Sequence, residues 1–354
     1  MSYMASSRSL LPPAYSLPVL DAVCRFCGIQ RDYPLLASAS QKIADDPGLV
    51  DFACSLYGEF TSGEKNFVDC HLPPDKLDKE TELIFELTAL SGIPAAIERY
   101  RQKGIAEDII AATLALTPGK RIQPVQLGYC RNYYRAEIYR LGRFHFKRHK
   151  DKRNLPAVLT SRKNPKKKVL LANDQTLCDD QGFMDLEKPA WIARTTVTDK
   201  MISGNLINPD GTVSRERAVF AFDEWTLRYG AREVIDMHIP AGGGMTAELS
   251  RTSLKKAFAF FDIENPVIYC DSWIFNPGLR NLPGTDNICA LAEMGRLFTT
   301  RSTGKDGMFF LFGRETDDIS SLPQCTTLQR SVTDYMRRGG KLRSCGIFFF
   351  EDEI

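Results

Sequence analysis

The sequence predicts an all-α N-terminal domain followed by an α/β domain with a mixed, twisted sheet flanked by helices. Three observations support this fold class. Before residue 135, apolar residues recur at helical spacing and few β-branched residues alternate. After residue 135, alternating runs indicate strands, with an amphipathic helix between two of them. The length of 354 residues is also more than one hydrophobic core normally fills.

We divide the chain into a flexible tail at 1–16, a helical domain at 17–134 and an α/β domain at 135–354. The tail combines small polar residues with prolines. Within the helical domain, Pro94 is expected near the start of a helix, where its missing N–H is tolerated. Gly104 is expected to end that helix.

The α/β domain begins with an alternating stretch and ends with an amphipathic helix and an apolar strand. Strands are predicted at 138–146, 202–207, 218–222, 234–239, 267–270, 308–312 and 346–350, and helices at 247–261 and 326–338. The sequence Asn208-Pro209-Asp210-Gly211 is a strong turn signal between two of these strands.

Composition excludes several classes of function. A net charge of +2 does not indicate a general polyanion-binding protein. No apolar run approaches the roughly 20 residues that span a bilayer, so no membrane partner is expected. The N-terminus lacks the pattern of a secretory signal, which favours a cytoplasmic protein with reduced thiols. Cys24 and Cys27, with Cys70-His71, could form a zinc site, but no second CxxC follows. We therefore expect no metal and interpret Cys24 as a buried helix residue.

Residues 147–168 form a basic segment with ten Lys or Arg residues and one acid, Asp151. We interpret it first as a solvated loop. An alternative is an anion-attracting rim for a phosphorylated ligand. Nucleic acid is the least favoured partner, because the segment lacks the interleaved aromatic residues on which single strands stack.

A candidate catalytic pair lies at the end of the strand predicted at 234–239. Asp236 and His238 are two residues apart, so both side chains point to one face of the strand. Histidine is suited to proton transfer near neutral pH, and a carboxylate can raise its basicity. We therefore assign His238 as a base and Asp236 as its orienter. The alternative is a buried histidine that is hydrogen-bonded to Asp236 for structural reasons.

The residues that follow this strand are typical of a phosphate-binding loop. Gly242, Gly243 and Gly244 lack Cβ atoms, so their backbone can approach a ligand closely. Thr246 is a plausible N-cap of the next helix, whose first N–H groups and dipole favour a pyrophosphate.

The neighbouring strand contributes further candidates. Cys270 could serve as a nucleophile, but no cysteine–histidine signature supports a covalent mechanism. Ser272 is included as a third candidate catalytic residue. Asn287, in the loop that follows, either contacts the cofactor or stabilises the turn.

Several short motifs resemble a bacterial acyltransferase family that joins a helical N-acyltransferase N-terminal domain to a GNAT-like C-terminal domain. The resemblance covers about 80 to 354. It is carried by His238-Ile239-Pro240-Ala241-Gly242, Cys270-Asp271-Ser272-Trp273, Asn276-Pro277, Leu282-Pro283 with Asn287-Ile288, Leu141-Gly142-Arg143, Asp210-Gly211 to Trp225, and Gly92-Ile93-Pro94.

This resemblance implies a GNAT-type fold and direct attack of an amine on the thioester of acetyl-CoA or another acyl-CoA. Two central parallel strands, 234–239 and 267–270, would splay apart around the pantetheine arm, and their N–H groups would polarise the thioester carbonyl. The loop after the first strand would hold the pyrophosphate, although it lacks the leading Arg or Gln of the usual GNAT loop. The expected cofactor contacts are Ile239, Ala241, Gly242, Gly243, Gly244, Thr246 and Asn287.

The acceptor is expected to be a small amine or a peptide-like molecule. A different class of function is a catalytically silent GNAT-like protein that binds a ligand or protein in the same cleft. A third is a nucleic-acid-associated factor that uses residues 147–168. Acyl-CoA binding separates the first class from the third, and turnover separates the first from the second.

Overall fold

The fold was analysed in a computed structural model, which describes residues 11–62, 77–152, 154–228, 233–240, 242 and 244–354. The chain divides into two compact units, residues 1–140 and 141–354. The sequence placed this boundary at 134/135. Among the described residues, no helix has the length and apolar character needed to cross a membrane.

The first unit is built from helices around one central helix. These helices are α2 (Leu17–Phe26), α3 (Tyr33–Ala44), α4 (Pro47–Ser62), α5 (Ile84–Ser91), α6 (Ile93–Gln102), α7 (Glu107–Leu114) and α8 (Leu127–Tyr134). Every residue of α5 is buried, which is typical of a helix at the centre of a bundle. Pro94 lies in the first turn of α6, and Cys24 is buried in α2, as the sequence predicted.

The predicted flexible tail is wrong for the part that the structure describes. Pro13–Tyr15 form a short 3-10 helix, and Ala14 and Tyr15 are buried. The backbone N–H of Ala14 donates to the Ser91 hydroxyl at 3.0 Å, so this segment packs against α5. Residues 1–10 lie outside the described residues.

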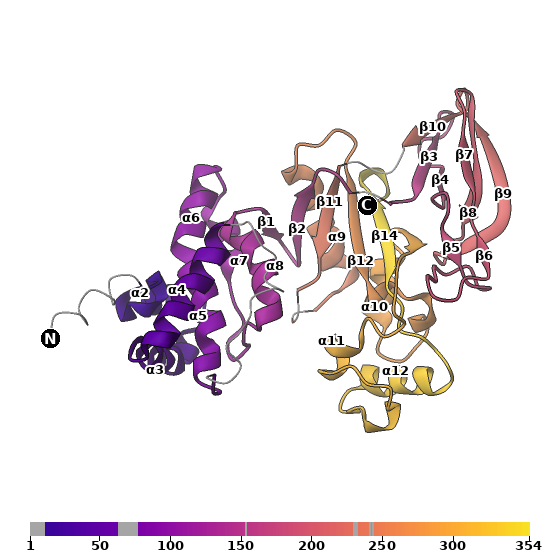
Figure 1. The fold of residues 1–354 in the computed structure, drawn as a ribbon. Coiled ribbons are helices and arrows are strands. Elements are labelled where there is room, and N and C mark those ends of the chain that lie inside the picture. Colours follow the sequence, from indigo (N-terminus) through magenta and orange to yellow (C-terminus); the bar gives the residue numbers. More distant parts are fainter. Residues whose placement is uncertain (1–10, 63–76, 153, 229–232, 241, 243) are drawn as a thin grey trace. The chain divides into compact units, whose positions relative to one another are not determined.

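The second unit provides five strands of a mixed six-stranded sheet, and Ile138–Leu141, at the boundary of the two units, provides the sixth. This sheet confirms the predicted α/β class (Figure 1). Its order is β1-β2-β11-β12-β14-β13. The strands are β1 (Ile138–Leu141), β2 (Phe144–His149), β11 (Val234–His238), β12 (Val267–Ser272), β13 (Arg296–Thr299) and β14 (Cys345–Phe350). β11 and β12 are parallel, whereas the pairs β2–β11, β12–β14 and β13–β14 are antiparallel.

Helices follow the strands of this sheet. The parallel connection between β11 and β12 is made by α9 (Ala247–Phe260), and α10 (Asp286–Ala292), α11 (Met308–Phe312) and α12 (Thr327–Arg337) come later in the chain. The Ser253 hydroxyl of α9 donates to the Leu141 carbonyl and accepts from the Phe144 N–H, so this helix is fixed on the sheet beside β2. α12 begins with a capping box between Thr326 and Gln329.

A second β structure is inserted between β2 and β11, and the sequence analysis missed most of it. Its strands are β3 (Ala157–Ser161), β4 (Lys168–Leu171), β5 (Leu177–Cys178), β6 (Trp191–Ile192), β7 (Thr195–Val197), β8 (Met201–Ile207), β9 (Val213–Ala221) and β10 (Trp225–Arg228). Leu155, Val158 and Leu170 from this part pack with Val234 and Tyr269 of the first sheet. The insertion therefore covers the sheet face opposite α9.

Three predicted elements need correction. The basic segment 147–168 is not a continuous loop, because it contains the end of β2 and most of the β3–β4 hairpin. The strand predicted at 138–146 is two strands, since Gly142 adopts φ +78° and turns the chain. The strand predicted at 308–312 is the helix α11, which ends at Gly313 in the left-handed conformation. A short apolar run does not distinguish a strand from a helical turn.

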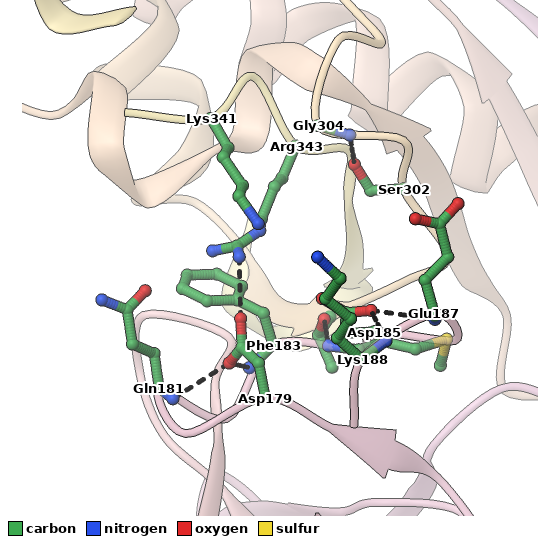
Figure 2. Close-up of polar contacts among 12 residues, drawn as sticks. Asp179, Gln181, Phe183, Asp185, Glu187, Lys188, Ser302, Gly304, Lys341 and Arg343 are labelled. Carbon is green, nitrogen blue, oxygen red and sulfur yellow. Dashed lines mark hydrogen bonds and ion pairs between the residues drawn. The ribbon is translucent and has the colours of Figure 1, made fainter. Parts of the chain in front are cut away.

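A largely buried ion pair joins the inserted β structure to the main sheet. Arg343, just before β14, donates to Asp179 at 2.7 Å, and both side chains are less than a fifth exposed, at 13% and 17%. Its guanidinium also lies 4.3 Å from the ring centre of Phe183 (Figure 2). Asp179 accepts from the backbone N–H groups of Gln181 and Phe183, which fixes the turn that Arg343 binds.

Replacing Arg343 with alanine is expected to lower the free energy of unfolding by about 3 kcal/mol, because it leaves the Asp179 carboxylate without its charge partner. Arg215 provides a matched control. It pairs with Asp180 at 3.2 Å and lies 5.1 Å from the ring of Trp191, but its side chain is 61% exposed. Arg215→Ala should cost less than about 1 kcal/mol. Urea unfolding measures both values, and equal losses would contradict this ranking.

Candidate active site

The two parallel strands β11 and β12 separate toward their carboxyl ends. Their pairing covers Ile235 with Ile268 and Asp236 with Tyr269, and within the described parts of both strands it does not continue further. On the outer sides, β11 stays paired with β2 as far as His238, and β12 stays paired with β14 as far as Ser272. The result is the splay that the sequence predicted for these strands.

Several polar side chains share one face of the sheet at this opening. Asp236 and Tyr269 are register partners, so alternation places His238 and Asp271 on the same face. This face is opposite to the one that carries Cys270 and α9. The arrangement collects an imidazole, two carboxylates and a phenol beside the gap.

His238 is suited to accept a proton. Its side chain is 35% exposed, and the burial of the remainder lowers the pKa of the imidazole below its ordinary value. The negative charge of Asp236 opposes this decrease, whereas the positive charges of Lys147 and Lys152 add to it. The ring is therefore neutral near pH 7, the state in which one nitrogen can act as a base.

Asp236 acts on His238 through its charge. The Oδ2 atom of Asp236 lies 3.8 Å from Nε2 of His238, which is beyond hydrogen-bond distance. The Asp236 side chain is only 16% exposed, so water screens the attraction weakly. The carboxylate is thus placed to stabilise an imidazolium when it forms.

Asp271 is a second acidic group that the sequence analysis did not assign. It accepts from the Thr300 hydroxyl at 3.0 Å and from the Tyr269 hydroxyl at 3.3 Å. Loss of hydration raises the pKa of this carboxyl group, and the two hydrogen bonds oppose that increase. The side chain still reaches solvent, so an acceptor could contact it.

Two residues near Asp271 were also missed, for different reasons. Thr300 follows β13, a strand that the sequence analysis did not predict. Lys152 lies in the basic segment that the sequence did reveal, and its ammonium nitrogen is 4.6 Å from the ring centre of Tyr269. Applying the alternation of side chains to the second parallel strand as well would have indicated Tyr269 and Asp271 as residues of the same face.

The structure does not bring Ser272 together with His238. Alternation places Ser272 on the face of Cys270, and its hydroxyl accepts from the Ile274 N–H at 3.4 Å. It therefore caps the 3-10 helix Trp273–Phe275. Complete burial raises the pKa of the Cys270 thiol well above its ordinary value, which disfavours a thiolate nucleophile.

The segment after β11 carries the residues that the sequence predicted for a phosphate-binding loop. The Thr246 hydroxyl accepts from the Leu249 N–H and caps α9, as predicted. Gly242 adopts φ +79°, a conformation that favours glycine. Ile239 precedes the loop and is half-buried, whereas Ala241 and Gly243 lie outside the described residues. Asn287 is exposed in the first turn of α10.

Arg143 holds this loop from a different part of the chain. Its guanidinium donates to the carbonyl of Pro240 at 2.8 Å and to the carbonyl of Gly244 at 3.1 Å. These two hydrogen bonds fix the direction of the backbone carbonyls at Pro240 and at Gly244. The loop lacks the leading Arg or Gln of the usual GNAT loop, but Arg143 contacts it from another part of the chain.

The fold and the match to two domain families define the class of protein, an acyltransferase with a GNAT-like domain. Residues 138–348 match the family described as "GNAT-like C-terminal domain", and residues 18–117 match the "N-acyltransferase N-terminal domain". The chain therefore belongs to the acyltransferase family with this GNAT-like C-terminal domain. The N-terminal match begins well before residue 80, where the resemblance in sequence motifs started. A search of curated proteins gave no match.

Solved structures of acyltransferases share the fold over nearly the whole chain. One, in complex with decanoyl-CoA and teicoplanin, has a TM-score of 0.58 at 17% identity and covers 98% of this chain and 93% of its own. A mutant in complex with octanoyl-CoA has a TM-score of 0.57 at 16% identity, with the same coverage. A third, with CoA and 10C-teicoplanin, has a TM-score of 0.58 at 17% identity and covers 96% and 89% of the two chains.

The protonation of His238 can be measured directly, because the chain contains four histidines. An NMR titration should give a midpoint for His238 below the ordinary value of about 6.5, since burial disfavours the charged ring. The spectrum of His238→Asn assigns the signal. The folded state then binds fewer protons than the unfolded state, so acidification through this range should lower stability. A midpoint at or above the ordinary value would contradict this assignment.

Proposed function

We propose that this protein is an acyl-CoA-dependent N-acyltransferase in which an acceptor amine attacks the thioester directly. The observation that carries the proposal is the opening between β11 and β12, with His238 at its edge and the capped start of α9 after it. Similar folds have been crystallised with decanoyl-CoA or octanoyl-CoA, which supports acyl-CoA as the donor.

The acyl donor would occupy the opening between the strands. The pyrophosphate would lie against the segment from Ile239 to Thr246, where the glycine backbone and the first N–H groups of α9 favour an anion. The pantetheine arm would then run between β11 and β12. Peptide N–H groups near the strand ends would polarise the thioester carbonyl and stabilise the oxyanion. Asn287, exposed in the first turn of α10, is a further candidate for a cofactor contact.

The reaction would proceed by addition and elimination. The amine nitrogen forms a bond to the thioester carbon, and His238 takes one proton from that nitrogen. The tetrahedral intermediate then breaks the C–S bond, and the leaving CoA thiolate takes the proton back from the His238 imidazolium. Asp236 stabilises the imidazolium by its charge at 3.8 Å.

The acceptor would be an amine carried by a peptide-like molecule. Two of the similar structures hold teicoplanin or its 10C form, which supports an acceptor larger than a simple amine. Asp271 reaches solvent at the opening, where its carboxylate could hold the acceptor ammonium until it loses one proton to solvent and becomes the nucleophilic amine. Water-exposed carboxylates recognise such groups by charge-assisted hydrogen bonds.

His238→Ala is expected to lower kcat/KM for acyl transfer roughly a hundredfold or more, because the general base is lost. The affinity for acetyl-CoA should stay near that of the wild type. Ser272→Ala is the matched comparison, since Ser272 lies on the opposite face and caps a turn. It should retain most of the activity. The proposed base is wrong if a folded His238→Ala variant turns over normally.

Gly244→Val tests the phosphate-binding loop. A Cβ atom at Gly244 would meet no other atom within 4 Å, and the backbone there has no positive φ, so the fold should tolerate the change. We expect CoA affinity to fall about tenfold if the backbone contacts the pyrophosphate. Gly244→Ala should have a smaller effect. Calorimetry gives both affinities, and unchanged binding with an unchanged unfolding midpoint would exclude this contact.

A further inference from the structure

The basic segment contributes one lysine to the face that carries the candidate site. Lys152 places its ammonium nitrogen 4.6 Å from the ring centre of Tyr269. Tyr269 is the register partner of Asp236 and donates its hydroxyl to Asp271. The cation is therefore held over the ring of Tyr269, on the sheet face that carries Asp236 and Asp271.

The groups that face His238 come from every strand around the opening. His145 and Lys147 of β2 are the register partners of His238 and Asp236, respectively. Asp236 belongs to β11 itself, while β12 contributes Tyr269 and Asp271. Among the described residues, the cations that act on the imidazole are Lys147 and Lys152. Lys152 also acts on Asp271, where the negative charge of Asp306 opposes it.

We propose that Lys152, held over the ring of Tyr269 beside Asp271, is a positioning residue for acyl transfer that acts through its charge on Asp271 and His238. This inference rests on the proposed function, because the neutral imidazole is needed to take a proton and the carboxylate to hold the acceptor ammonium. A positive charge opposes protonation of both groups, so one cation that acts on both favours the neutral imidazole and the ionised carboxylate. The stacking on Tyr269 fixes the ammonium in place.

The charge pattern of this segment allows a matched set of variants. Lys152→Met should raise the titration midpoints of both His238 and Asp271, and Lys152→Arg should restore both toward the wild type. Lys147→Met should raise the midpoint of His238 and leave that of Asp271 in place. Lys150→Met should move neither, because Lys150 is exposed and acts on Glu233. NMR titration of the free protein measures both midpoints, with His238→Asn and Asp271→Asn for assignment.

The same variants have a kinetic readout. With acetyl-CoA as the donor, the acid limb of kcat/KM should move to higher pH in Lys152→Met, and the rates should converge at high pH. The proposal is overturned if Lys152→Met leaves the Asp271 midpoint unchanged, or if Lys150→Met moves it equally. If the wild type neither binds acetyl-CoA nor transfers an acyl group while the midpoints move as expected, the proposed function fails and the charge relationship stands.

Discussion

The candidate site depends on a single parallel pairing that stops early. A parallel pair needs a crossover connection, and here it is α9 that returns the chain from β11 to β12. The start of α9 must therefore lie just beyond the carboxyl end of β11. Because the pairing ends at Asp236 and Tyr269, the strand gap, the glycine segment and the helix N-terminus all occur at the same edge of the sheet.

The gap is maintained by what lies on either side of it. The outer pairings continue to His238 on β11 and to Ser272 on β12, so neither strand end is free to close on the other. Ser253 fixes α9 through the Leu141 carbonyl and the Phe144 N–H. On the opposite face, the inserted β structure packs on the sheet and is joined to it by Arg343. Both layers thus contribute to the position of the polar side chains.

The sequence predicted the features that local rules determine. Asp236 and His238 share a face because strand alternation has a period of two, and Thr246 caps a helix because a hydroxyl can accept from its first turn. The placement of Asp271 beside Thr300 depends on register between distant strands, which no local pattern contains. Most of the inserted β structure was missed for a related reason: strands as short as Leu177–Cys178 show little alternation, and tertiary packing decides them.

The basic segment illustrates how surroundings decide the effect of a charge. Counted along the sequence, its lysines are indistinguishable, and most of them would be solvated and screened. The fold separates them, because the insertion that begins after β2 brings Lys152 over Tyr269, whereas Lys150 stays exposed. A cation beside partly desolvated groups acts through a lower effective dielectric than one in water. The contact of Lys152 with Tyr269 therefore depends on the fold, and the net charge of the segment does not predict it.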